Sequence, residues 1–480
     1  MQDIQNYIDG KLVAPSRGKY RENMEPATGM PWSRVPESSA MDVDSAVTAA
    51  KKAFPDWSAM PAEERAHWLS RLADSIDRHA EKLAEAETRD TGKPIRLARD
   101  VEIPRAARNF RFYAAAATQF FSESHAMEND AINYTLRQPL GVVGCISPWN
   151  LPLYLFTWKV APALAAGNCV VSKPSEVTPM TAYLFSEICR DIDFPAGVLN
   201  VVHGTGLSVG VPLVEHANIK AVSFTGGTRT GADIAARAAP RFKKLSLELG
   251  GKNPNIIFAD CDWETMLATT LRSSFSNQGQ ICLCGSRIYV ESKVYERFVA
   301  ELVQRAKAMR IGDPMEDATE QGAVVSQQQH EKILGCITSA REDGGEIHCG
   351  GEPVTVAGRC ENGWFIAPTV ITGLGPDCRT NQEEIFGPVV TVTPFESEDE
   401  VLQLANGTEY GLAASIWSQN ISRCHRLAKG IESGLVWVNT WMLRDLRTPM
   451  GGMKQSGMGR EGGFDSMRFF TEAKNVCIKY

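Results

Sequence analysis

Four short apolar runs between residues 141 and 225 constrain the fold of this chain most strongly. Each run stops at a proline or at glycines, and a stretch with helical periodicity separates most of them. This spacing is typical of repeated βα units, so it predicts a doubly wound parallel sheet that binds ligands at the carboxyl ends of its strands. The expected strands are residues 141–147, 169–173, 198–202 and 221–225.

A second block, from residue 245 to about 451, alternates strands and helices in the same way and predicts a second α/β domain. Its expected strands are 287–290, 389–392 and 415–417, and its expected helices are 292–309 and 327–342. Residues 42–86 and 90–117 are expected to be helical, and 133–137 to be a strand.

The C-terminal tail, residues 468–480, alternates as an exposed strand would. An unpaired strand edge promotes aggregation, and pairing with another subunit would remove it. We therefore expect a homo-oligomer, either a homodimer or a homotetramer.

Composition narrows the class of protein. A chain of 480 residues with net charge -7 has room for two or three domains and gives no electrostatic basis for binding nucleic acid or an anionic membrane. The N-terminus lacks the pattern of a signal peptide and no long apolar run is present, so we expect a cytoplasmic protein with no membrane span. The twelve cysteines and eight histidines are scattered without metal-ligand spacing, which predicts no metal site.

Four residues could take part in covalent catalysis. Cys282 and Cys284 lie in a polar, glycine-flanked stretch, and a cysteine thiolate is the best protein nucleophile near neutral pH; the alternative is a buried structural cysteine. Glu248 lies between two leucines, where a desolvated carboxylate could act as a general base, although a solvated strand end is also possible. Asn150, in a rigid Pro-Trp-Asn-Leu-Pro stretch, could donate to an oxyanion or merely form a turn.

Further polar and glycine-rich stretches follow the predicted strands of the first block. Lys173 and Glu176 could hydrogen-bond ribose hydroxyls after the second strand. The glycine-rich turns at 204–210 and 226–231 follow the next two strands, but neither matches G-x-G-x-x-G, so each by itself is a weak indication of a dinucleotide site.

Together these stretches resemble the aldehyde dehydrogenase superfamily in order and rough spacing over essentially the whole chain. The resemblance is carried by Pro-Trp-Asn, Lys-Pro-Ser-Glu, Phe-Thr-Gly-Gly, Leu-Glu-Leu-Gly-Gly, Gly-Gln-Ile-Cys and Glu-Ile-Phe-Gly-Pro, which end at residues 150, 176, 227, 251, 282 and 388. It implies that Cys282 is the nucleophile, Glu248 the general base and Asn150 an oxyanion donor. The implied NAD-binding residues are Ser147, Pro148, Trp149, Lys173, Ser175, Glu176, Gly206, Phe224, Thr225, Gly226, Gly227, Leu249, Glu384 and Phe386.

The resemblance also implies a fold with two Rossmann-like domains and a small β element for oligomerisation. We expect residues 1–118 and 140–249 to form the NAD-binding domain, 250–450 the catalytic domain, and 119–139 with 466–480 the oligomerisation element. The implied reaction oxidises an aldehyde to a carboxylate through a thiohemiacetal and a thioester on Cys282. Glu176 favours NAD over NADP, because a carboxylate would repel a 2′-phosphate.

Within the superfamily the chain is most similar to the 2-aminomuconic and 2-hydroxymuconic semialdehyde dehydrogenases, through stretches around residues 109–114, 147–159, 281–284 and 441–446. This implies a carboxylated semialdehyde such as 2-aminomuconic 6-semialdehyde, with Arg111 and Arg444 holding the far carboxylate. The alternative is that either arginine forms a surface or interdomain salt bridge. The sequence leaves other substrates possible: 2-hydroxymuconic semialdehyde, betaine aldehyde or a general aliphatic aldehyde. It also leaves two other functions possible, a CoA-acylating enzyme and a binding protein without turnover.

Overall fold

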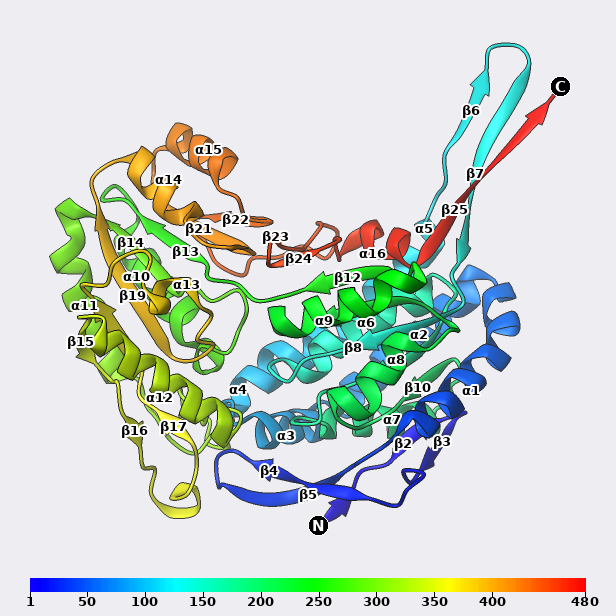
Figure 1. The fold of residues 1–480 in the computed structure, drawn as a ribbon, viewed down its shortest axis with the longest axis horizontal. Coiled ribbons are helices and arrows are strands. Elements are labelled where there is room, and N and C mark those ends of the chain that lie inside the picture. Colours follow the sequence, from blue (N-terminus) through cyan, green and yellow to red (C-terminus); the bar gives the residue numbers. More distant parts are fainter.

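The computed structural model describes residues 1–480, and the chain forms two lobes that each contain a largely parallel sheet (Figure 1). The sheet of the first lobe has eight strands in the order β24-β12-β11-β8-β9-β10-β2-β3, and the strands from β12 to β10 run parallel. These strands are β2 (Asn6–Ile8), β3 (Lys11–Val13), β8 (Val142–Ile146), β9 (Cys169–Lys173), β10 (Leu199–Val201), β11 (Ile219–Thr225), β12 (Lys244–Glu248) and β24 (Gly457–Met458).

Helices cover the first sheet, and one large apolar cluster joins them to it. Their sequences match the predicted periodicity, but the expected helix over 42–86 is broken at Pro61 and again at His79. Helix α5 packs against both α2 and α6, a contact that positions several site residues. The helices are α1 (Ala40–Ala59), α2 (Ala62–Arg78), α3 (Ala80–Thr91), α4 (Ile95–Leu97), the π-helix η1 (Ala98–Glu102), α5 (Ile103–Gln119), α6 (Pro152–Ala165), α7 (Met180–Asp191), α8 (Val211–Glu215) and α9 (Thr228–Ala238).

The second lobe contains a sheet of seven strands in the order β15-β18-β19-β14-β13-β21-β22, in which only β15 is antiparallel. Its strands are β13 (Pro254–Ile257), β14 (Arg287–Glu291), β15 (Glu346–Cys349), β18 (Thr369–Thr372), β19 (Val389–Phe395), β21 (Ala413–Trp417) and β22 (Leu435–Val438). Its helices are α10 (Trp263–Phe275), α11 (Tyr295–Ala308), α12 (Gln327–Glu342), α13 (Arg379–Gln382), α14 (Glu398–Asn406) and α15 (Ile421–Gly430).

A narrow three-stranded sheet projects from the first lobe (Figure 1). It consists of β6 (Ser124–Met127), β7 (Ala131–Pro139) and β25 (Thr471–Lys479), in the order β25-β7-β6, and α16 (Gly463–Phe469) leads into β25. The C-terminal tail contains a strand, as the alternating sequence predicts, and every residue of β25 pairs with β7. Only the outer edge of β25 is unpaired.

The two large sheets present opposite ends to each other. The predicted cofactor residues of the first lobe lie at or just beyond the ends of β8, β9, β10, β11 and β12, at the carboxyl edge of the first sheet. Cys282 and Glu384 instead precede β14 and β19, at the amino edge of the second sheet. The carboxyl-end rule for ligands therefore applies to the first lobe but not to the second.

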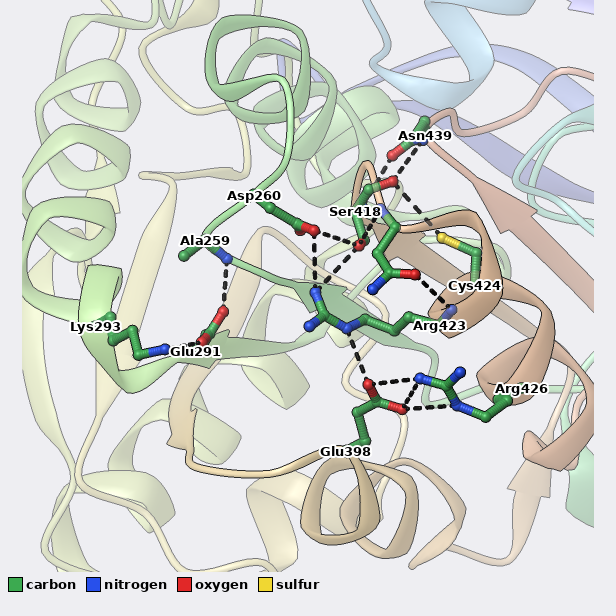
Figure 2. A network of polar contacts seen from close by, with 11 residues as sticks. Ala259, Asp260, Glu291, Lys293, Glu398, Ser418, Arg423, Cys424, Arg426 and Asn439 are labelled. Carbon is green, nitrogen blue, oxygen red and sulfur yellow. Dashed lines mark hydrogen bonds and ion pairs between the residues drawn. The ribbon is translucent and has the colours of Figure 1, made fainter.

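A polar network occupies the carboxyl edge of the second sheet, away from Cys282 (Figure 2). Arg423 of α15 bonds Asp260 beyond β13 at 3.2 Å and Glu398 of α14 at 3.1 Å. Ser418 and Asn439, which follow β21 and β22, exchange hydrogen bonds of 3.1 and 2.9 Å. These bonds connect the strand ends to α14 and α15. The site lies at the opposite edge of the sheet.

Three small sheets complete the fold. A second three-stranded sheet near the N-terminus has the order β1-β5-β4, and the strand pairs β16-β17 and β20-β23 form two two-stranded sheets. Their strands are β1 (Gln2–Asp3), β4 (Tyr20–Glu25), β5 (Met30–Pro36), β16 (Pro353–Val354), β17 (Phe365–Ile366), β20 (Tyr410–Gly411) and β23 (Met453–Lys454). No helix of the structure combines the length and the apolar character needed to span a bilayer.

Candidate active site

The loop that carries Cys282 follows α10 and is tightly constrained. Asn277 and Gln278 have φ values of 52° and 55°, and Gly279 has a φ of 69°. A side chain at Gly279 could not fit, since its Cβ would lie 2.0 Å from the Gly387 carbonyl oxygen. The loop therefore holds Cys282 in one place, with its carbonyl accepting a 2.7 Å hydrogen bond from Asn253 Nδ2.

Cys282 and Cys284 differ in exposure. Cys282 is half-buried and borders two cavities, whereas Cys284 is buried and borders only one of them. Burial raises the pKa of the Cys282 thiol, and the carboxylates of Glu384 and Glu248 raise it further. Cys282 is therefore protonated in this state, and its attack requires a group that removes the proton.

Glu248, at the end of β12, has the properties of such a base. Burial raises its pKa to about 8, and Glu461 adds to this effect while Lys159 and Arg444 oppose it. Its Oε1 atom is buried and has no hydrogen-bond partner. A carboxyl group that titrates near neutral pH and has a free oxygen can accept a proton from a thiol or from water.

Behind Glu248 lies a buried ion pair that the sequence reasoning missed. Lys159 of α6 donates to Glu461 Oε1 at 2.8 Å, and Ser223 of β11 donates to the same oxygen at 2.9 Å. The side chains of Lys159 and Glu461 are 0% and 7% exposed. A charged residue inside the apolar sequence of α6 was the available signal, because lysines are almost never fully buried without a partner.

A cavity of about 210 Å³ lies in front of Cys282 and brings together residues from both lobes. Asn150 borders this cavity, and its side-chain amide donates a 3.0 Å hydrogen bond to the Gln280 carbonyl, two residues before Cys282. Trp149 and Phe386 form one of its corners, with their rings edge to face at 5.1 Å. The other predicted residues on its wall are Pro148, Thr225, Gly226, Gly227, Leu249 and Glu384, and the wall also includes Gly250, Gln329 and Lys332, which were not predicted.

Features of the first lobe fit the pyrophosphate of a dinucleotide. Space around Gly227 is open, and this glycine is the N-cap of α9, where backbone N–H groups favour an anion. The hydroxyls of Thr225 and Thr228, on either side of it, are buried without partners. Phe224 packs so closely on Gly226 that a Cβ there would lie 2.4 Å from the ring, which explains this glycine.

Lys173 and Glu176 form an ion pair of 2.8 Å just beyond β9. Burial tends to raise the pKa of Glu176, but the charge and hydrogen bond of Lys173 outweigh burial, and the pKa is lowered. Glu176 is therefore an ionised carboxylate that can accept from ribose hydroxyls. Ser147, Ser175, Gly206 and Phe224 lie on the same strand ends but outside the cavity in front of Cys282.

Glu384 approaches from the other lobe. Its side chain is half-buried, and its Oε1 accepts a 3.0 Å hydrogen bond from the Gly251 backbone N–H. Burial raises the pKa of Glu384, with Gly251, Lys332 and Lys252 opposing. The resemblance implies that a ribose binds to this carboxylate, where it would replace the water that burial removes.

Two guanidinium groups, Arg444 and Arg105, lie over one face of the site. Arg444 donates to Tyr154 Oη at 3.1 Å, contacts the sulfur of Met450, and lies 5.4 Å from the centre of the Trp158 ring. Arg105 of α5 lies 5.7 Å from that same ring, and one of its terminal nitrogens is buried without a partner. Neither arginine forms an ion pair with a carboxylate within the chain.

Arg111 does not lie with them, contrary to the sequence-based expectation. It is on a different face of α5, since six residues along a helix correspond to a turn of about 240°. Its guanidinium bonds Asp74 and Asp77 of α2 at 2.7 and 2.5 Å, with its side chain 44% exposed. We therefore replace Arg111 by Arg105 as the partner of Arg444. The packing of α5 decides which of its arginines faces the site, and the sequence pattern does not reveal this packing.

Comparison with known proteins agrees with the family that the sequence resembles. The family model described as "Aldehyde dehydrogenase family" matches residues 13–476. The chain is 49% identical to the 2-aminomuconic semialdehyde dehydrogenase of Danio rerio, covering 99% of this chain and 98% of that protein. It is 46% identical to the 2-hydroxymuconic semialdehyde dehydrogenase of Pseudomonas sp. (strain CF600), with 100% of both chains covered.

Among solved structures, the NAD+ complex of an aldehyde dehydrogenase from Bacillus cereus matches with a TM-score of 0.97 at 41% identity, covering 99% of this chain and 96% of that one. The predicted family and the predicted α/β fold class are thereby confirmed.

Proposed function

Because the chain belongs to the aldehyde dehydrogenase family, we propose that it oxidises an aldehyde to a carboxylate with NAD+, and that its substrate is a semialdehyde with a carboxylate at the other end. The observation that carries the substrate class is the pair Arg105 and Arg444, two part-buried guanidinium groups on one ring without a carboxylate partner. Two like charges held together in a part-buried site repel each other, and a carboxylate of the substrate would relieve that repulsion.

The residues of the chain account for the acyl chemistry. Glu248 accepts the proton of Cys282 directly or through water, and the thiolate attacks the aldehyde carbon. The Asn150 amide and a backbone N–H near Cys282 stabilise the oxyanion of the resulting thiohemiacetal. NAD+, when bound, accepts the hydride.

The remaining steps release the acid. After it has released the first proton to solvent, Glu248 removes a proton from a water molecule that attacks the thioester on Cys282. The acid leaves, and the Cys282 thiolate takes this proton back from Glu248, which restores the thiol. Water as the acyl acceptor is favoured over CoA because Glu248 has a free, buried oxygen with a raised pKa close to Cys282.

The residues fit NAD. The open space at Gly227, the unpartnered hydroxyls of Thr225 and Thr228, and the ionised Glu176 would hold its pyrophosphate and its adenosine ribose. Glu384 would hold the second ribose near Cys282, since both border the same cavity.

A substrate panel tests the proposal. We expect the highest kcat/KM, read as NADH formation, for a muconic-type semialdehyde such as 2-aminomuconic 6-semialdehyde or its 2-hydroxy analogue. Betaine aldehyde carries a positive charge and is expected to be disfavoured by Arg105 and Arg444. Equal kcat/KM for an uncharged aliphatic aldehyde of the same length would contradict the substrate class, and a strict requirement for CoA would contradict hydrolysis.

The wider organisation remains part of the proposal. We propose the domain division given above, with β6, β7 and β25 as the element that joins subunits of a homodimer or homotetramer. The unpaired outer edge of β25 supports this, because an exposed strand edge favours pairing. We also propose a cytoplasmic location, which the unpaired state of all twelve cysteines supports. Light scattering on the purified protein measures the subunit number.

A further inference from the structure

The turn that carries Asn150 is held from behind by groups outside the reaction described above. The main-chain carbonyl of Asn150 accepts two hydrogen bonds, from Lys93 Nζ at 2.8 Å and from Asn277 Nδ2 at 3.0 Å. The side-chain amide of the same residue donates to the Gln280 carbonyl, which also accepts a 3.2 Å hydrogen bond from Asn277 Nδ2. The direction of this amide therefore depends on where the carbonyl is held.

Lys93 is in turn held by a buried carboxylate. Its ammonium forms an ion pair with Glu102 of the π-helix η1, and the two side chains are 0% and 1% exposed. Burial raises the pKa of Glu102, Lys93 opposes this, and the nearby Glu87 adds to it. Lys93 thus pairs with Glu102, which lies beside the second carboxyl group of Glu87 on the neighbouring α3.

The same cluster also reaches the other end of the turn. Glu87 of α3 accepts a hydrogen bond of 3.4 Å from the backbone N–H of Leu153, in the first turn of α6. The segment from Asn150 to Leu153 is therefore held at its carbonyl by Lys93 and at its following N–H by Glu87. Both holding residues come from the region around the end of α3.

Stability alone explains this arrangement poorly. Replacing a buried ion pair by apolar side chains of similar volume is often neutral or stabilising, because desolvation offsets most of the attraction between the charges. The bond from Lys93 to the Asn150 carbonyl has a more specific consequence. A shift of about 1 Å in a reacting group can cost about a hundredfold in rate.

We propose that Lys93, oriented by Glu102, is a positioning residue that aims the Asn150 amide at the oxyanion formed on Cys282. The inference rests on the proposed function, in which Asn150 stabilises that oxyanion. Lys93 does not contact the reacting atoms and acts only through Asn150.

A double-mutant cycle separates this role from a general structural one. Lys93→Met is expected to lower kcat about 10- to 100-fold while leaving KM for the semialdehyde and Kd for NAD+ within about threefold. In the background of Asn150→Ala the same substitution is expected to change kcat by less than about twofold, since the group that it positions is gone. An equal loss in both backgrounds, or an unchanged kcat in Lys93→Met, would overturn the proposal.

Two further variants keep the outcome interpretable. Lys82→Met removes an exposed lysine of α3, the helix that ends two residues before Lys93; Lys82 pairs with Glu187 at 3.3 Å, and its replacement is expected to leave kcat unchanged. If Lys93→Met does not fold, as judged by circular dichroism and NAD+ binding, Glu102→Gln keeps the side-chain shape and is expected to show the same non-additivity with Asn150→Ala. An Asn150→Ala enzyme with unchanged kcat would instead refute the role of Asn150 in the proposed function.

Discussion

Replacing Arg105 is the most direct test of substrate recognition. In Arg105→Met the chain keeps most of the apolar stem and loses the charge that lies 5.2 Å from the Tyr154 ring and 5.7 Å from the Trp158 ring. Burial already lowers the pKa of Arg105, and Tyr154 opposes this while Arg444 adds to it, so a substrate carboxylate would relieve an unfavourable charge arrangement. The same change should therefore weaken binding of an acidic substrate without weakening the fold.

The magnitude follows from the geometry. A hydrogen bond to a charged group contributes about 1.5–3 kcal/mol. At about 1.4 kcal/mol for each factor of ten, Arg105→Met should lower kcat/KM for the carboxylated semialdehyde about 10- to 150-fold. Arg444→Met should have an effect of the same order, because Arg444 lies over the same Trp158 ring.

The assay is steady-state NADH formation with the acidic semialdehyde and with an uncharged aldehyde of equal length. Both arginine variants are expected to lose selectivity between the two substrates. Arg111→Met is the matched control on the same helix and should change neither value, since Arg111 bonds only Asp74 and Asp77. If kcat/KM for the acid stays within about threefold of wild type in Arg105→Met, or falls in Arg111→Met instead, the reasoning from the structure is refuted.

Four further predictions concern the chemistry, the stability and the cofactor. Cys282→Ala should abolish turnover and retain NAD+ binding measured by fluorescence, whereas Cys284→Ala should stay active; the reverse would reassign the nucleophile. Because the pKa of Glu248 is raised to about 8, its base form accumulates as pH rises, so the deacylation rate should increase up to about pH 8 and lose this dependence in Glu248→Gln. The raised pKa also means that ionisation of Glu248 destabilises the folded state. The free energy of unfolding should therefore fall as the pH rises from 4.5, the ordinary pKa of a glutamate, to about 8. Glu248→Gln lacks this loss and should gain in Tm relative to wild type over this range. Glu176→Ser should lower kcat/KM for NAD+ and raise it for NADP+, and unchanged discrimination would exclude the carboxylate as its cause.

Local sequence was sufficient to predict the strands that position the cofactor residues. The runs before Pro148 and Pro174 are apolar on both faces and end at residues that cannot continue a ladder, so β8 and β9 lie close to where they were expected. The residues that resemble family motifs follow these strands directly. The chain carried enough information to place Asn150, Glu248 and Cys282 in one predicted site because each belongs to a short, distinctive stretch.

Tertiary structure alone decided which charged side chains meet. Arg105 and Arg111 are the same residue type on one helix. Only the packing of α5 against α2 and α6 places Arg105 beside Trp158 and Arg111 beside Asp74 and Asp77. Lys159 and Glu461 are separated by 302 positions, and Lys93 and Asn150 by 57. Local periodicity reports which face of an element is buried, but which buried groups touch depends on how distant elements pack, and that is set by the whole core rather than by any one segment.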